Sequence, residues 1–166
     1  MGDILRSPVT GNALLLVPRS GSHSISAAAL EQWWPEGYSA WMAAERGHPA
    51  QFFGDQESLN SQSQRESLAV VVRNPVERFR SLCAHRQLDV DEQLADPMYG
   101  PLPPGPFVHY FKFETDLDAA AEWLGLPLPL RLEDASDEAD KPLLTPEQEA
   151  RVREIYADDI DLWESL

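Results

Sequence analysis

The sequence predicts an α/β fold in three layers, with a mostly parallel sheet flanked by helices on both faces. Two short apolar runs, Ala13–Val17 and Leu68–Val72, show no polar alternation, which is typical of strands buried on both faces of a parallel sheet. Each run is followed by turn residues and then by a helical pattern, and this alternation defines the class. With 166 residues, the chain has the size of one domain (about 100–200 residues), so we expect a single domain over residues 1–166.

The two turns after these runs predict where helices begin. The first run leads through Pro18–Ser22 into an Ala-rich stretch that predicts a helix extending toward Trp34. After the second run, Asn74 is a favourable N-cap and Pro75 suits the first helical position. Glu77 stands three residues after the cap, as in a capping box. We therefore expect a helix that begins at Pro75.

The remaining chain predicts one more strand and two more helices. His109–Phe113 is apolar and precedes a short helix over Asp116–Leu124, whereas the proline-rich stretch Pro97–Pro106 predicts an extended, exposed loop. Thr145–Gln148 has the pattern of a capping box with proline at the first position, so it predicts the last helix. The apolar stripe of that helix, between Val152 and Trp163, is expected to pack on the sheet.

Charge and cysteine content exclude several classes of protein. The net charge is −15, of which residues 1–113 carry −3 and the last 53 residues carry −12. Such an acidic surface disfavours binding to nucleic acid. The single cysteine excludes an internal disulfide framework and a multi-cysteine zinc site. No apolar run approaches the roughly 20 residues that span a bilayer, so we expect a cytoplasmic protein with no membrane partner.

The turn after the first strand has the residues of an anion site. Gly21 allows close approach of the backbone, Ser22 and Ser24 offer hydroxyl groups, and Arg19 adds a permanent charge at the start of a helix. The glycine spacing and the Lys-Ser/Thr pair of a Walker A motif are missing. Because Gly-Ser turns before helices are common, a purely structural turn is an equally good interpretation of this segment alone.

The turn after the second strand adds an arginine and a hydroxyl group. Arg73 ends the strand, and Ser81 follows eight residues later on the helix, so the two can clasp a phosphate. Alternatively, Arg73 pairs with a surface carboxylate and Ser81 fills a small gap. If the two strands are neighbours, however, the two turns together predict a site that binds an anion at both ends.

These residues resemble the sulfotransferases that use 3′-phosphoadenylylsulfate (PAPS). Leu14–Ile25 resembles the loop that holds the 5′-phosphosulfate, and Val72–Ser81 resembles the more specific 3′-phosphate motif, with its Arg, Pro and later Ser. Phe111–Leu126 and the Leu-Thr-Pro-Glu-Gln start of the last helix are similar to short bacterial and phage-encoded members. The resemblance covers the chain from Ala13 onward, with gaps in the Trp-rich and Pro-rich loops, and implies a P-loop-like sulfotransferase fold.

The resemblance implies a reaction and a set of site residues. Arg19, with the backbone of Ser20–Ser24, would stabilise the departing 5′-phosphate, while Arg73 and Ser81 would recognise the 3′-phosphate. PAPS is then the co-substrate and adenosine 3′,5′-bisphosphate (PAP) the product, with no metal required. The acceptor would be a hydroxyl or amine on a small molecule or glycan. The residues expected to hold the cofactor are Arg19, Ser20, Gly21, Ser22, His23, Ser24, Arg73 and Ser81.

The acceptor also needs a general base. His48 lies in a loop between the two phosphate motifs, where many family members place a catalytic histidine, so we expect Arg19 and His48 to be the catalytic residues. Glu45 or Asp55 is an alternative base. Two other functions remain open: a nucleotide-binding or interaction module that has lost catalysis, and a small P-loop kinase.

Overall fold

The computed structural model describes residues 3–44, 67–103, 105, 107–131 and 137–166. Four strands form one sheet in the order β1-β2-β3-β4. Their bounds are β1 Asp3–Arg6, β2 Ala13–Leu16, β3 Leu68–Val72 and β4 His109–Lys112. Strands β2, β3 and β4 are parallel, but β1 pairs with β2 in the antiparallel direction. The α/β class is confirmed, whereas the expected mostly parallel sheet is a mixed sheet.

Strand β1 was not predicted from the sequence. This segment, Asp-Ile-Leu-Arg, has only four residues, and its charged ends resemble a loop more than a buried strand. It lies at the edge of the sheet, where one side of a strand has no partner and charged residues are tolerated. The pairing of Ile4 with Leu15 and of Leu5 with Leu14 places it in register with β2.

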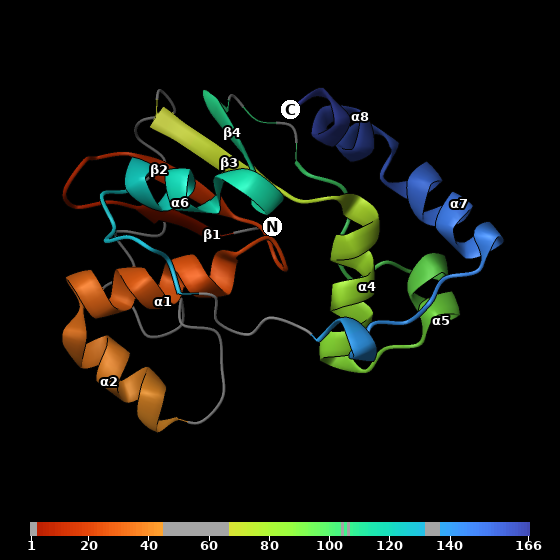
Figure 1. The fold of residues 1–166 in the computed structure, drawn as a ribbon, viewed down its shortest axis with the longest axis horizontal. Helices are drawn as coiled ribbons and strands as arrows, with labels where there is room; N and C mark the ends of the chain where they lie inside the picture. The colour runs from red at the N-terminus through yellow and green to blue at the C-terminus, as the bar shows by residue number, and fades with distance from the viewer. Residues whose placement is uncertain (1–2, 45–66, 104, 106, 132–136) are drawn as a thin grey trace.

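The helices have the following bounds: α1 Ser22–Trp33, α2 Pro35–Ala43, α4 Pro75–Arg86, α5 Val90–Ala95, α6 Phe113–Trp123, α7 Pro146–Ile155 and α8 Ala157–Ser165, with a short 3-10 helix η3 at Glu138–Asp140. Figure 1 shows α4, α5 and α7 beyond the end of the sheet at which β3 runs into α4. Within the described residues, no helix has both the length and the apolar character that a membrane span requires.

Alternate side chains of the strands pack into two layers of core. Leu14, Leu16 and Val71 face helices α1 and α6, whereas Leu15 and Val72 face the opposite side. There they meet α8 and the partly buried side chains of Leu102 and Phe107. Helices therefore flank the sheet, and part of the proline-rich segment, which was expected to be exposed, covers its second face.

The predicted last helix is two helices that meet at Tyr156. The capping box of Thr145 and Gln148 is present at the start of α7, as predicted. Val152 and Tyr156 then pack against Phe79 and Cys83 of α4 rather than on the sheet. Only α8 reaches the sheet, so the apolar stripe of the C-terminal region serves two separate clusters.

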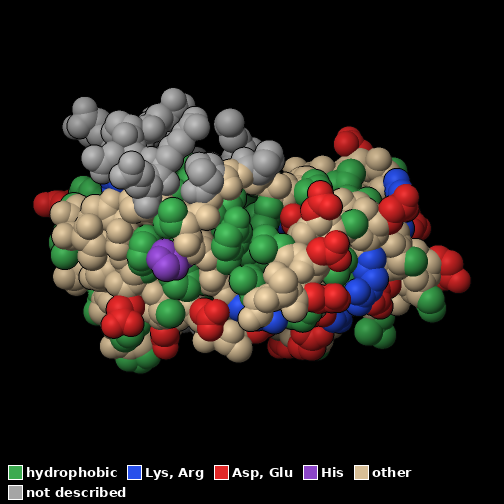
Figure 2. All heavy atoms as spheres, turned by 90° about the horizontal axis from the view of Figure 1, so that it is seen from above, with side chains coloured by type: hydrophobic (Ala, Val, Ile, Leu, Met, Phe, Trp, Pro, Cys, Tyr) green, Lys and Arg blue, Asp and Glu red, His purple; other side chains and the backbone are tan. Residues whose placement is uncertain are grey.

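The C-terminal helices also carry much of the acidic surface. Figure 2 shows acidic side chains, with a smaller group of basic ones among them, at the end of the molecule formed by α7 and α8. Several of these charges are paired along one helix, such as Arg151 with Glu154 and Arg153 with Glu149.

Candidate functional site

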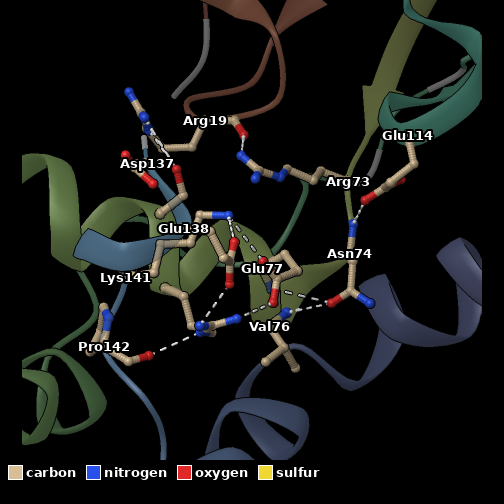
Figure 3. Close-up of polar contacts among 12 residues, drawn as sticks. Arg19, Arg73, Asn74, Val76, Glu77, Glu114, Asp137, Glu138, Lys141 and Pro142 are labelled. Carbon is tan, nitrogen blue, oxygen red and sulfur yellow. Dashed lines mark hydrogen bonds and ion pairs between the residues drawn. The ribbon is translucent and has the colours of Figure 1, made fainter. Parts of the chain in front are cut away.

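The structure brings the two predicted anion turns together. Because β2 and β3 are parallel neighbours, their carboxyl ends lie at the same edge of the sheet. The Arg73 Nη1 donates a hydrogen bond of 2.7 Å to the backbone carbonyl of Arg19 (Figure 3). The Arg19 Nε and Nη2 in turn donate to the Ser81 Oγ at 3.2 and 3.1 Å. Three of the predicted site residues therefore form one connected group.

The first turn has an unusual backbone. Arg19 adopts a left-handed conformation with φ 63°, and Gly21 adopts another with φ 79°. For a residue with a side chain this conformation costs roughly 1–2 kcal/mol. Hydrogen bonds fix the turn on both sides, because the Ser20 N–H donates to the Val17 carbonyl at 3.1 Å and Arg73 holds the Arg19 carbonyl. Arg19, which has this strained backbone, is also the residue whose guanidinium reaches Ser81 on α4.

Arg73 carries a positive charge that no described carboxylate neutralises through an ion pair. Its guanidinium lies 4.6 Å from the centre of the Phe113 ring, and its Nε is buried without a hydrogen-bond partner. Burial and the neighbouring Arg19 charge lower its pKa, and the nearby carboxylates of Glu114, Glu77 and Glu138 offset part of this lowering. The Oγ of Ser20, whose residue is 2% exposed, also has no partner. A buried donor without a partner beside two cations is the arrangement that an anion would satisfy.

The second turn is held by a contact that differs from the predicted capping box. The Asn74 side chain accepts hydrogen bonds from the backbone of Val76 and Glu77, as an N-cap should. The backbone N–H of Asn74, however, donates to Glu114 of α6 at 3.0 Å rather than to Glu77. Glu77 instead forms ion pairs with Arg80 and Lys141. The predicted reciprocal box is wrong because these cations draw the Glu77 carboxylate away from the turn.

An ion-pair network holds the segment after η3 against α4, close to this turn. Glu77 and Glu138 each pair with both Arg80 and Lys141, and Arg80 also donates to the Pro142 carbonyl at 2.9 Å (Figure 3). The hydrogen bond from Lys141 and the nearby Arg80 charge lower the pKa of the exposed Glu138. The network fixes an acidic segment within electrostatic reach of Arg73.

A groove lies beside the first anion turn. It is a shallow groove open to solvent, with about 520 Å³ of empty space that includes part of the solvent outside it, and it runs between α1, α2 and the segment 127–131. Its lining residues are Ser24, Ala27, Ala28, Glu31, Tyr38, Pro127, Pro129, Leu130 and Arg131. Ser24, in the first turn of α1, is the residue that the groove lining shares with the predicted anion-binding residues. The walls combine apolar surface with a few polar groups, which is the composition typical of small-molecule sites.

The other predicted residues lie in different settings. His23 packs edge-on against Trp41 of α2, with the ring centres 5.7 Å apart, at the start of α1. Ser22 and Ser24 are buried. His48, the expected base, lies outside the described residues, as do the alternatives Glu45 and Asp55. Among the described residues, no group of three or more His, Cys, Asp or Glu side chains is arranged to hold a metal ion.

Glu114 and, apart from Ser24, the residues that line the groove were not predicted from the sequence. Glu114 lies 40 residues from its partner Asn74 along the chain, and local sequence patterns do not predict contacts between residues so far apart. The groove residues come from three separate segments, so only the folded chain places them together.

Comparison of the chain with protein-family models, with curated proteins and with solved structures gave no match in any of the three.

Proposed function

We propose that this protein is a PAPS-dependent sulfotransferase with a P-loop-like fold. The observation that carries the proposal is the pair of arginines at the adjacent ends of β2 and β3, where Arg73 has a buried Nε without a partner and no described ion pair. The Arg19 charge disfavours the charged form of Arg73, and Glu114, Glu77 and Glu138 offset part of this effect without forming an ion pair with Arg73; a bound anion would offset more of it. The sequence resemblance specifies that anion as the 3′,5′-bisphosphate of PAPS.

The proposed chemistry assigns a task to each turn. The acceptor oxygen or nitrogen attacks the sulfur, the bond from sulfur to the 5′-phosphate oxygen breaks, and the acceptor proton passes to a base, for which His48 is the proposed residue. Arg19 offsets the charge that develops on the leaving phosphate, and this requires positioning rather than covalent catalysis by the protein. Arg73 and Ser81 hold the 3′-phosphate, which then replaces part of the hydrogen bonding between Arg19 and Ser81.

The groove beside Ser24 supports a nucleotide rather than a bare anion as the ligand. It adjoins the first anion turn, and its alanines and prolines offer apolar walls on which a purine ring can lie. Tyr38, Glu31 and Arg131 add polar groups at its rim. We therefore propose that the adenosine part of PAPS occupies this groove while its phosphates reach the two arginines.

Calorimetric titration with PAP, beside AMP and ATP and without metal, tests the proposal. We expect PAP to bind with a micromolar Kd, about −8 kcal/mol, and AMP to bind much more weakly because it lacks the 3′-phosphate. Arg73→Ala should abolish this preference. Arg151→Ala is the matched control, since Arg151 is half exposed on α7 and pairs only with Glu154 among the described residues. Equal losses in the two variants, or equal binding of PAP and AMP, would contradict the proposal.

A second candidate function is a nucleotide-binding module without catalysis. The observation that favours it is that Nε and Nη2 of Arg19 both donate hydrogen bonds to Ser81 on α4. These two nitrogens are therefore already used within the protein. PAP binding without sulfuryl transfer to any member of an acceptor panel of sugars, phenols, steroids and amines would favour this candidate. Transfer of radiolabelled sulfate from PAPS to one acceptor would exclude it.

A further inference from the structure

Glu114, the second residue of α6, joins the anion site to the C-terminal helix. Its Oε1 accepts a hydrogen bond of 3.0 Å from the backbone N–H of Asn74, and its Oε2 accepts one of 3.0 Å from the indole Nε1 of Trp163. Figure 3 shows Glu114 reaching the turn directly after Arg73. One carboxylate thus bridges two segments that are far apart in the sequence.

Each end of this bridge has a defined role in the fold. Asn74 follows Arg73 and caps α4, so its backbone sets the direction in which Arg73 leaves the strand. Trp163 packs with Leu162 on the second face of the sheet, and the Nζ of Lys112 lies 4.2 Å from the centre of its ring. The docking of α8 on the sheet therefore brings the indole N–H to Glu114.

We propose that Glu114 is a positioning residue of the anion site and that, through it, the docking of the C-terminal helix sets the affinity of this site for anions. With both oxygens engaged, the carboxylate holds the β3–α4 turn in the conformation that directs Arg73 toward Arg19. The inference rests on the proposed function only in requiring that Arg73 bind an anion, whether or not that anion is a nucleotide.

The charge of Glu114 and its positioning role predict opposite results, which makes the inference testable. Glu114 is a negative charge near Arg73, so removing the charge alone should strengthen anion binding. In Glu114→Gln the side chain keeps its shape but has a single acceptor oxygen, so only one of the two hydrogen bonds can remain. If positioning dominates, this variant binds anions more weakly. Trp163→Phe keeps all charges and most of the packing but loses the indole donor, and it should act in the same direction.

The experiment titrates inorganic sulfate, and separately PAP, into the wild-type protein, Glu114→Gln, Trp163→Phe and the double variant. NMR follows the Nε–H signal of Arg73, a donor that has no partner in the unliganded protein. The control is Glu122→Gln, which removes an exposed charge at the far end of the same helix. Thermal unfolding of each variant ensures that binding is compared between folded proteins.

We expect each single variant to weaken sulfate binding about fivefold, the effect of one hydrogen bond of ~1 kcal/mol. The double variant should be no weaker than the weaker single variant, because both changes break the same bridge. Wild-type affinity in both single variants, tighter binding in Glu114→Gln, or additive losses would overturn the inference. If sulfate binds but PAP does not, the proposed cofactor is refuted. The sulfate affinities of the wild-type protein and the variants then still test the role of Glu114. If the wild-type Arg73 signal responds to neither anion, both are refuted.

Discussion

Gly21→Ala tests how tightly the first anion turn packs against α6. Gly21 has φ 79°, and a Cβ at this position would lie 2.6 Å from the Cδ1 of Leu117 and 3.4 Å from the Phe113 ring. Gly11 has nearly the same φ, 75°, but a Cβ there would meet nothing within 4 Å. The two substitutions therefore share the backbone cost of a left-handed alanine, about 1 kcal/mol, and only Gly21→Ala adds a clash.

The clash at Gly21 requires Leu117 to change rotamer or the turn to move away from α6, which costs about 1–3 kcal/mol in a packed site. In a chain of this length 1 kcal/mol corresponds to roughly 2–4 °C in Tm. We expect Gly11→Ala to lower Tm by that amount and Gly21→Ala to lower it at least twice as far, as measured by calorimetry. Equal shifts in the two variants would refute the reasoning, because they would mean that the turn has free space above it.

Three further predictions concern single side chains. Arg19→Gly should relieve the left-handed backbone and keep or raise the unfolding free energy by about 1 kcal/mol, while PAP affinity falls about tenfold or more; a large loss of stability in urea unfolding would contradict it. The Cys83 thiol is 2% exposed, and burial raises its pKa to about 11. It should therefore react slowly with a chromogenic disulfide at pH 8, faster as the pH approaches 11, and fast in urea; rapid labelling of the native protein would disprove this. Tyr156→Phe removes a 2.6 Å hydrogen bond to the Tyr99 carbonyl and should cost about 1–2 kcal/mol in chemical unfolding, whereas the exposed Tyr110→Phe serves as a control with little effect.

Local patterns predicted the elements whose signals lie within a few neighbouring residues. The strands β2 and β3 are uninterrupted apolar runs, β4 is a short run with Tyr110 and Phe111 at its centre, and the positions of all three match the prediction to within one residue. The N-cap at Asn74 and the capping box at Thr145 also follow from residues three positions apart. For the same reason, the two turns of the candidate site could be found in the sequence, and their proximity followed once β2 and β3 were assumed to be neighbours.

Features decided by contacts between distant segments could not be predicted in this way. No glycine or proline marks the break between α7 and α8 at Tyr156, where the two helices pack on different clusters. Helix α6 begins at Phe113, three residues before the predicted start, with an irregular backbone at Asp116, whose carboxylate accepts the Lys112 N–H. The Glu114 bridge is of the same kind, since it joins Asn74 and Trp163, which lie 40 and 49 residues from Glu114 along the chain.

The position of α8 has a consequence for the synthesis of this protein on the ribosome. The side chains of Val70 and Val72 on the second face of the sheet are made about 90 residues before Leu162 and Trp163, which cover them. At translation rates of roughly 5–20 residues per second, this apolar face waits on the order of 5–20 s for α8, whereas Leu102 and Phe107, which also pack on it, are made earlier. During that interval the nascent chain exposes a surface suited to chaperone binding, and slower translation of the last third should increase aggregation. Helix α8 thus affects when the second face of the sheet is covered, as well as how that face is packed.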